Sequence, residues 1–303
     1  MARKKMSKRT KKRLLQFYLF IMPGILGFLI FTIYPVFYSF VISFTNRNLL
    51  DPANMEFVGF QNYRAFFTGQ DPLFGITLRN TFVFAVLNVV GTNVIALLTA
   101  LLLTAKVKFI NMFRTIFFLP SLLPAVASAI MFRWLFDPTS GLVNGILRLF
   151  GVSEPPLWLD SADTALYTLV FISLYAFGGK MVIYISGLNN VSKDHYESAD
   201  IDGANMWNKF IYITIPLISP IIFYNFLMGS IGALQVFTEG FVISGSGPNN
   251  STLFYILRLY NLAYLMPFRL GQAAAMAWVL FAITAVISGV YFIINKKLVY
   301  YES

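Results

Sequence analysis

Three carboxylates and two very small residues occur close together in one polar stretch of the chain, between two long apolar ones. Glu197, Asp200 and Asp202 would offer negative charge to the Arg or Lys side chains of another protein. Ser198 and Ala199, which follow Glu197 directly, would let the backbone of such a protein approach closely. These residue types favour a docking segment. The alternative is an amphipathic connector that lies on the lipid headgroups.

The same stretch carries local signals for a short helix followed by a turn. Ser192 is a favoured N-cap residue and Asp194 is favourable in a first turn, so a helix is expected from Lys193 to Asp200. Gly203 can adopt the positive φ that ends a helix and turns the chain. A second segment from Asn205 would then lead into the next apolar run.

One lysine stands in the middle of an apolar segment. A charged side chain at the bilayer centre costs about 2.5–3.5 kcal/mol on insertion scales, which makes Lys180 a functional hypothesis by default. Lys180 either lines a transport pathway or serves a structural role, by snorkelling to the interface or by pairing within the protein. His195, the single histidine of the chain, is expected to be a solvated loop residue.

Composition assigns the chain to the integral membrane proteins. Of its 303 residues, 57% are hydrophobic and 12% are charged, and the mean hydropathy is +0.69. Soluble domains carry about 25% charged residues, so this chain has about half the charge that a water-facing surface needs. The lack of cysteine excludes a thiolate nucleophile and a cysteine-ligated metal, and the single histidine excludes a histidine-based metal cluster.

Six apolar stretches are long enough to cross a hydrocarbon core of about 30 Å, which takes about 20 helical residues. We therefore predict an all-α membrane protein with six transmembrane helices in a single domain, 14–303, which follows a basic tail, 1–13. The loop 189–212, between the fourth and fifth spans, contains the docking segment. The predicted spans cover about 14–44, 78–104, 115–136, 165–188, 213–237 and 272–295.

Charge predicts the orientation of these spans. Of the 23 Lys and Arg residues, 15 fall on the side that holds both termini, seven fall on the opposite side, and Lys180 lies within a span. Since cytoplasmic loops carry the excess of Lys and Arg, both termini are predicted to lie on the cytoplasmic side of the membrane. The net charge of +10 is thus a signal of topology, and we expect no nucleic-acid partner.

The polar loop resembles a known motif. Glu197-Ser-Ala, three residues, Gly203, nine residues and then Ile213–Pro216 is similar to the EAA motif of ABC importer permeases, in which this loop forms the helix that docks on the ATPase subunit. Ser198 replaces the usual alanine, which is a change between small residues. The resemblance implies that the coupling residues are Glu197, Ser198, Ala199, Asp202, Gly203 and Ala204.

The resemblance extends over essentially the whole chain, to the permeases of maltose/glycerol-phosphate-type carbohydrate importers. One departure is Ser246, which stands where the family's Gly-Gly-Pro loop has a glycine. The other matching segments are Phe31–Pro35, Phe57–Tyr63, Phe113–Pro120, Trp134–Pro138 and Gly247-Pro248.

What the resemblance implies is a type I ABC importer permease fold and transport of a sugar or oligosaccharide by alternating access. The implied partners are a second homologous permease, a cytoplasmic P-loop ATPase and an extracytoplasmic solute-binding protein. A P-loop needs glycine, four residues and then Gly-Lys-Ser/Thr, and the nearest segment here, Gly178–Met181, lacks the first glycine and the hydroxyl. We therefore expect no cofactor and no catalysis in this chain, with ATP and Mg bound by the partner ATPase.

A sugar pathway needs hydrogen-bonding groups for hydroxyls and aromatic faces for the apolar side of the ring. Gln235 and Phe237 are the leading candidates, because similar permeases place pore-lining residues just before the Gly247-Pro248 loop. Each candidate could instead be an ordinary contact between helices. The further candidates are Asn225, Tyr175, Asn88 and Lys180.

Two other function classes compete with the importer. An ion-coupled secondary transporter would normally show carboxylates inside the membrane or discontinuous helices near the midplane. Here every Asp and Glu is expected in a loop, in a tail or at the edge of a span, with Glu239 just past the fifth span. An intramembrane enzyme would need nucleophiles or paired membrane carboxylates that this sequence does not offer.

Overall fold

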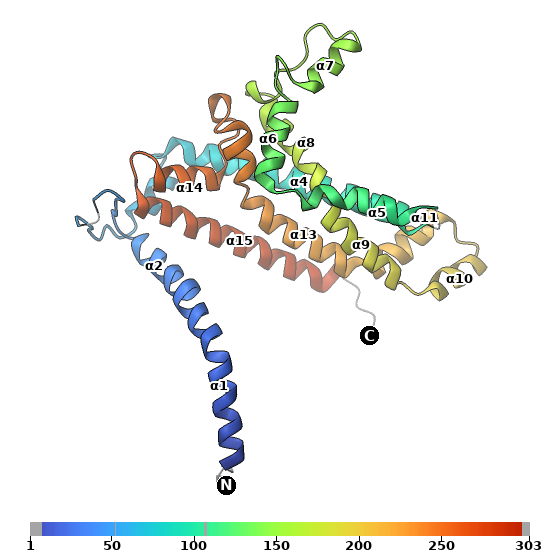
Figure 1. Cartoon of the computed structure of the whole chain (residues 1–303), viewed down its shortest axis with the longest axis horizontal. Coiled ribbons are helices and arrows are strands. Elements are labelled where there is room, and N and C mark those ends of the chain that lie inside the picture. The colour runs from blue at the N-terminus through green and yellow to red at the C-terminus, as the bar shows by residue number, and fades with distance from the viewer. Residues whose placement is uncertain (1–7, 52, 106–107, 299–303) are drawn as a thin grey trace. The chain divides into compact units, whose positions relative to one another are not determined.

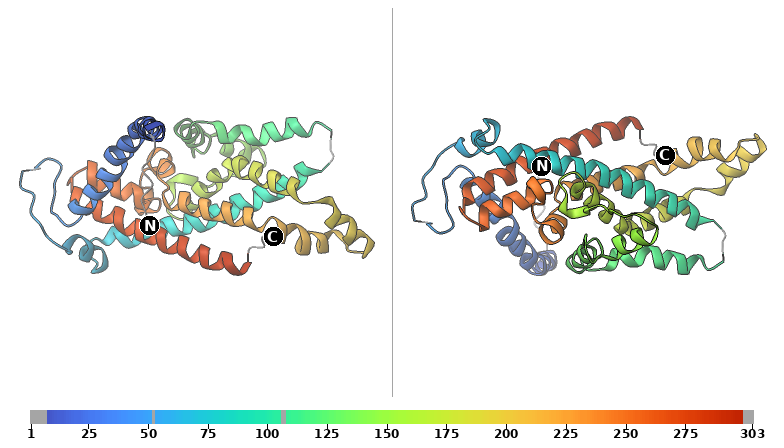
Figure 2. Two further views of the ribbon diagram at one scale, coloured as in Figure 1. Left: turned by 90° about the horizontal axis from the view of Figure 1, so that it is seen from below. Right: turned by 90° about the horizontal axis from the view of Figure 1, so that it is seen from above.

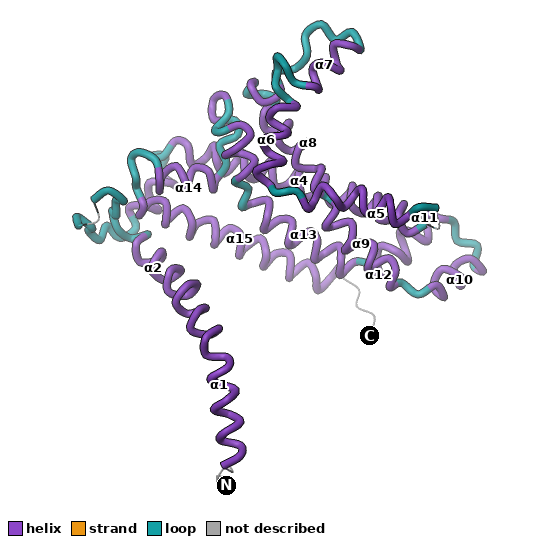
Figure 3. Tube along the Cα trace, viewed as in Figure 1, coloured by secondary structure: helices purple, strands orange, loops and turns teal. Residues whose placement is uncertain are grey.

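The computed structural model describes residues 8–51, 53–105 and 108–298. Within these ranges every regular element is a helix, and extended pairing is limited to two isolated bridges, Thr45 with Phe57 and Asn48 with Arg269 (Figure 3). The chain divides into two compact units. One runs up to Ala65 and includes Leu262–Trp278, and the other holds Phe66–Asn261 and the chain from Val279 on.

The first unit is built on the long N-terminal helix. Helices α1 (Lys8–Phe28) and α2 (Tyr34–Ile42) are joined by a π-helical turn, η1 (Leu29–Ile33), directly before Pro35. Proline lacks the N–H that an α-helix would use, and a wider turn before it accommodates that loss. The apolar segment Lys12–Ile42 is long enough to cross a membrane, which confirms the predicted first span.

Hydrogen bonds attach the chain after α2 to short helix α3 (Gln61–Phe67). The amide of Asn62 donates to the carbonyl oxygens of Ser43 and Thr45, both at 2.8 Å. The hydroxyls of Ser43 and Tyr63 lie 2.7 Å apart. Together these bonds close the loop that follows the first span.

The second unit is organised around α4 (Pro72–Thr104), which at 33 residues is about 50 Å long. Asp71 is its N-cap, since its carboxylate accepts the N–H of Leu73 at 3.1 Å, and Pro72 stands at the first helical position. The helix therefore begins six residues before the predicted 78. Helices α9 (Gly178–Asn190) and α13 (Ser219–Leu234) both pack against α4 (Figures 1 and 2).

The third predicted span is broken. Helices α5 (Ile110–Phe118) and α6 (Ala125–Leu135) flank a short 3₁₀ turn, η2 (Leu119–Leu122), and the two arms are bent by 95°. The physical cause is local: Leu123 has ψ 138°, the extended conformation that a following proline imposes, and the α-helix cannot continue through it. The predicted third span, 115–136, thus corresponds to two helices that meet at a sharp bend.

The fourth span is also bent, by 47°, where η4 (Leu174–Ala176) separates α8 (Ala165–Ser173) from α9. Gly178 is needed at this bend, because a Cβ there would lie 2.6 Å from the carbonyl oxygen of Phe117. The glycine lets α9 approach the end of α5 more closely than any side chain would allow.

The fifth span starts and ends later than predicted. The segment that is long and apolar enough to cross a membrane runs over Ser219–Ser244, so it includes α13, a short non-helical stretch and the π-helical segment η6 (Glu239–Ser244). Before it stand α11 (Met206–Lys209), the π-helical η5 (Phe210–Thr214) and α12 (Ile215–Leu217). Glu239 therefore lies within a membrane-crossing segment, and the expectation that it falls just past the span was wrong.

The sixth span is α15 (Leu270–Leu298), whose apolar part, Leu270–Lys296, confirms the prediction. In the second unit, the hydroxyls of Tyr291 on α15 and Ser230 on α13 form a hydrogen bond of 2.9 Å. The described residues thus hold four helices that can cross a membrane, or six spans when each bent pair counts as one. The remaining helical elements are α7 (Leu142–Leu149), η3 (Trp158–Asp160), α10 (Lys193–Ile201), η7 (Pro248–Asn250) and α14 (Tyr255–Tyr264).

Candidate functional site

A cavity of about 380 Å³ lies between α4, the bent α8–α9 pair and the end of α13. Apolar walls come from residues such as Phe84, Met228 and Val236. The polar side chains that line it are Asn88, Thr92, Ser173, Lys180, Gln235, Thr238 and Glu239. A mixed lining of this kind, within membrane-crossing helices, is suited to a hydroxyl-bearing solute.

Hydrogen bonds order one wall of the cavity. The side-chain amide of Asn88 donates to the hydroxyl of Ser173 at 2.7 Å, and Ser173 donates to the carbonyl oxygen of Val170 at 2.6 Å. The hydroxyl of Thr92 donates to the backbone carbonyl of Asn88 at 2.7 Å and accepts a hydrogen bond from the ammonium of Lys180. These hydrogen bonds link the second span with both arms of the bent fourth span through polar groups that face the cavity.

The end of the Lys180 side chain lies close to Gly229 of α13. A Cβ on Gly229 would lie 3.0 Å from the Nζ atom of Lys180. The side chain is partly buried, and its hydrogen-bond partner, Thr92, is a neutral hydroxyl. In the described part of the chain no carboxylate oxygen lies within salt-bridge distance of this ammonium.

Four of the six predicted pathway residues come together in this cavity: Asn88, Lys180, Gln235 and Phe237. The other two do not line it. Asn225 is buried, with 2% of its surface exposed, and the ring of Tyr175 packs against Phe132 at a centroid distance of 4.8 Å. Contact of any of the six with a substrate stays a prediction.

Sequence reasoning missed four of the polar lining groups: Thr92, Ser173, Thr238 and Glu239. Thr92 and Ser173 were not distinguished from other hydroxyls in apolar helices, and Glu239 was placed outside the span. Nor did it predict that Tyr184 and Asn93 form a buried pair, in which the hydroxyl of Tyr184 donates to the side-chain oxygen of Asn93 at 2.8 Å. The available signal was the presence of polar residues in apolar helices, but that signal does not say which of them meet.

The polar loop forms the helix and the turn that its residues predict. Helix α10 (Lys193–Ile201) begins at Ser192, whose hydroxyl accepts the N–H of Asp194 at 3.3 Å. It ends in a Schellman motif: the N–H of Gly203 bonds to the carbonyl of Asp200 at 3.1 Å, and that of Ala204 bonds to Ala199 at 2.9 Å. Gly203 has φ +73°, so the predicted left-handed turn is confirmed.

Two contacts attach α10 to the start of the fifth span. The ammonium of Lys209 donates to the carboxylate of Asp200 at 2.6 Å, and the hydroxyls of Tyr196 and Thr214 lie 2.9 Å apart. Asp200 therefore has a partner within the chain, whereas we expected it to face another protein. Movement of α10 would be transmitted to η5 through these contacts.

Several side chains of this loop are exposed to solvent in the described structure. Glu197, Ser198 and Asp202 are exposed, as predicted for docking residues. Next to them three apolar side chains are also exposed, Ile201 by 88%, Met206 by 83% and Trp207 by 72%. Sequence reasoning did not assign these apolar residues to docking, although an apolar centre with a charged rim is typical of a protein interface.

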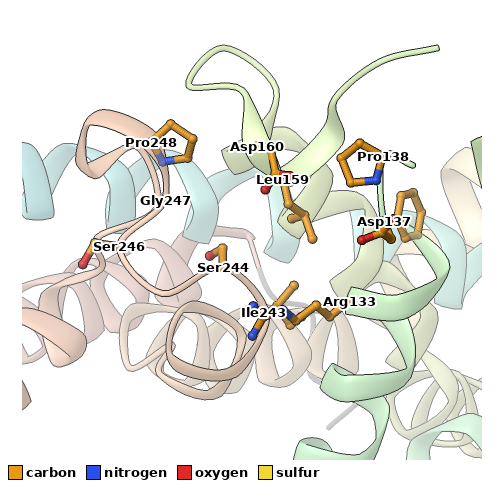
Figure 4. Close-up of a pocket in the computed structure, with 11 residues that line it drawn as sticks. Arg133, Asp137, Pro138, Leu159, Asp160, Ile243, Ser244, Ser246, Gly247 and Pro248 are labelled. Atoms are coloured by element: carbon orange, nitrogen blue, oxygen red, sulfur yellow. The ribbon is translucent and has the colours of Figure 1, made fainter. Parts of the chain in front are cut away.

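A second cavity, of about 500 Å³, lies between the end of α6, η3 and the loop after η6 (Figure 4). Arg133, Asp137, Asp160 and Ser244 line it. The carboxylate of Asp137 accepts hydrogen bonds from the backbone N–H and hydroxyl of Ser140 and from those of Thr139. These bonds hold the pKa of Asp137 well below its usual range. This carboxylate stays charged at any physiological pH.

Comparison with known proteins gives a family and a fold. Residues 92–300 match the family model described as "Binding-protein-dependent transport system inner membrane component". The probable ABC transporter permease protein YesP of Bacillus subtilis (strain 168) is 37% identical over 99% of this chain and 96% of its own length. The arabinooligosaccharides transport system permease protein AraP of the same organism is 35% identical over 89% of this chain and 85% of its own length.

Among solved structures, a bacterial ABC transporter involved in the import of the acidic polysaccharide alginate has a chain of the same fold. The TM-score is 0.83 with 21% identity, over 96% of this chain and 98% of that one. The bent third and fourth spans therefore belong to a known fold of transporter subunits.

Proposed function

The chain belongs to the family of binding-protein-dependent transport system inner membrane components, and from this membership we propose that it is the permease subunit of an ATP-driven importer of saccharides. The observation that carries the proposal is the cavity lined by Asn88, Lys180, Gln235 and Phe237 within membrane-crossing helices. The names of relatives such as AraP support an oligosaccharide as the substrate.

The docking loop supports an ATPase as a separate partner. In this proposal Glu197, Ser198, Ala199, Asp202, Gly203 and Ala204 form the surface that meets the ATPase, with Ile201 and Met206 at its apolar centre. ATP and Mg would bind to that partner, since this sequence carries no P-loop.

Coupling would follow from the attachments of α10. Closure of the ATPase would displace α10, and the Asp200–Lys209 and Tyr196–Thr214 contacts would pass the displacement to the fifth span. Because Gln235 and Glu239 lie at the far end of that span, the cavity would change its access from one side of the membrane to the other.

The remaining partners in this proposal are a second homologous permease and an extracytoplasmic solute-binding protein. The family's description, a binding-protein-dependent transport system, supports the second of these. We place both termini in the cytoplasm of a bacterium, because 15 of the 23 Lys and Arg residues fall on that side. The cavity lined by Arg133 and Asp160 would then open toward the binding protein.

Affinity purification of the tagged chain from its native membrane, followed by mass spectrometry and an ATPase assay, tests the proposal. We expect a second six-span permease and a P-loop ATPase to copurify, and ATP hydrolysis to rise on addition of the loaded binding protein. A matched control is the same tag on a chain that lacks the loop between Ser192 and Asn205, which should insert but lose the ATPase.

A contrary result would be a chain that copurifies with no ATPase and supports uptake in liposomes under an ion gradient alone. Glu239 within the fifth span gives this ion-coupled alternative its one intramembrane carboxylate among the described residues that line the cavity. That outcome would replace the importer with a secondary transporter.

A further inference from the structure

The cavity contains one cation without a matching anion. Among its described lining residues, Lys180 is the only basic one and Glu239 the only acidic one, and the two form no ion pair. Thr92 accepts one hydrogen bond from the ammonium of Lys180. Since an ammonium has three N–H donors, two are left without a partner in the described structure.

An ammonium at this depth is costly unless an anion or several acceptors surround it. A purely structural lysine would be expected to reach a carboxylate or a set of backbone carbonyls, and Lys180 reaches neither. Gly229 leaves room for the ammonium at the cavity wall. This arrangement indicates that the ammonium of Lys180 binds an anionic ligand.

The groups around Lys180 specify the rest of that ligand. The amide oxygen of Asn88 and the amide of Gln235 have no partner in the described residues and can bond to hydroxyls. Phe237 stacks on Phe241 at a centroid distance of 5.1 Å, which holds an aromatic ring at the cavity wall. Aromatic faces and amides together suit a sugar ring.

We propose that the cavity takes a saccharide that carries a carboxylate, with the acidic group bonded to Lys180 and the hydroxyls to Asn88 and Gln235. The proposal rests on the proposed import function and gives its substrate class. A charge-assisted bond between ammonium and carboxylate is about twice as strong as a neutral hydrogen bond. Glu239, in the same cavity, would repel a second acidic group near the end of α13, so a single acidic residue fits best.

The absence of cysteine from the chain permits a direct electrostatic test. Met228 lines the cavity and precedes Gly229, so the Met228→Cys variant places a single thiol of this chain near the ammonium. In the complete transporter, purified in detergent, the probes are the anionic sulfonatoethyl and the cationic trimethylammonioethyl methanethiosulfonates. Their relative rates of reaction report the local potential.

We expect the ratio of anionic to cationic labelling to fall about fivefold or more when Lys180→Met is added, because a unit charge at this range dominates the local potential. Lys180→Arg should keep the ratio, and Glu239→Gln should raise it. An unchanged ratio in both the Lys180→Met and Gly229→Ala backgrounds would refute the assignment. Gly229→Ala keeps the charge of Lys180 but displaces its ammonium, so the labelling ratio can be tested in this variant if Lys180→Met does not fold.

Ligand protection then tests the substrate class. A disaccharide with one uronic acid, galacturonosyl-galactose, should slow labelling of the thiol more than neutral galactobiose of the same linkage does, and Lys180→Met should abolish the difference. Equal protection by both, or protection by galactobiose alone, would overturn the proposal.

ATP-dependent uptake, measured in liposomes with the same protein, reports on the import function separately. Acid-selective protection without ATP-driven uptake would refute the importer and support the carboxylate site. ATP-driven uptake with no preference for the acid would refute the carboxylate site alone.

Discussion

Replacement of Gly203 separates two explanations for the turn that ends α10. Gly203 has φ +73°, and a Cβ built on it meets no atom of the described structure within 4 Å. A side chain there would therefore strain the backbone without any clash inside the chain. The family resemblance implies a second reason for a glycine, a close fit of the helix against the ATPase subunit.

The strain sets the expected magnitude. A left-handed conformation costs a non-glycine residue about 1–2 kcal/mol, and a β-branched residue fares worst. If that free energy is lost from the docked conformation, Gly203→Val should lower substrate-stimulated ATP hydrolysis by about 5- to 30-fold. Asparagine tolerates this conformation, so Gly203→Asn should keep hydrolysis within about twofold of the wild type.

The assay is stimulated ATP hydrolysis by the complete transporter in liposomes, with membrane insertion checked by protease protection. Gly69 provides the matched control, because it has φ +77° and equally open surroundings in the loop before α4. Gly69→Val should leave hydrolysis unchanged. Normal stimulation in Gly203→Val would refute the coupling assignment. Loss of hydrolysis in both Gly203→Val and Gly203→Asn would show that the ATPase needs the space that a side chain at position 203 would fill.

Two further predictions concern folding. Gly178→Val should lower the yield of folded protein in size-exclusion chromatography, since a Cβ there would lie 2.6 Å from the carbonyl oxygen of Phe117. The control, Gly179→Val, should be tolerated, because a Cβ at position 179 meets no atom within 4 Å. Similar yields of the two variants would contradict the close approach of the helices. Arg258→Met should destabilise the protein by about 3–5 kcal/mol, because it leaves the buried carboxylate of Asp71 without its partner at 3.2 Å. Asp71→Asn added to Arg258→Met should recover part of that loss in thermal unfolding, and a double variant no better than the single one would contradict the role of the pair.

Local features were predictable because they depend on neighbours in the chain. The apolar runs around α4 and α15 are long enough to mark spans whatever they pack against. Ser192 and Gly203 could be assigned as helix start and turn, since capping and positive φ are properties of single residues and their immediate backbone.

The sequence marks the bend of the third span by a proline but does not give its angle, and the bend of the fourth span has no proline. Pro124 makes Leu123 extended, yet the 95° between α5 and α6 depends on what each arm packs against. Likewise the length of the fifth span depends on η6, a π-helical segment that hydropathy does not distinguish from a loop.

Which polar residues meet was decided by the tertiary structure alone. Helices as uniformly apolar as α4 and α13 present no polar face, so their sequences do not indicate how each is rotated against its neighbours. Lys180 and Thr92 are 88 residues apart, and Asp71 and Arg258 are 187 apart. Residue types thus determined that the chain has segments able to cross a membrane and one polar loop with a capped helix. Only the packing of the spans decided that an unmatched ammonium faces a cavity, because contact between distant segments depends on how the helices are rotated and at what depth they meet.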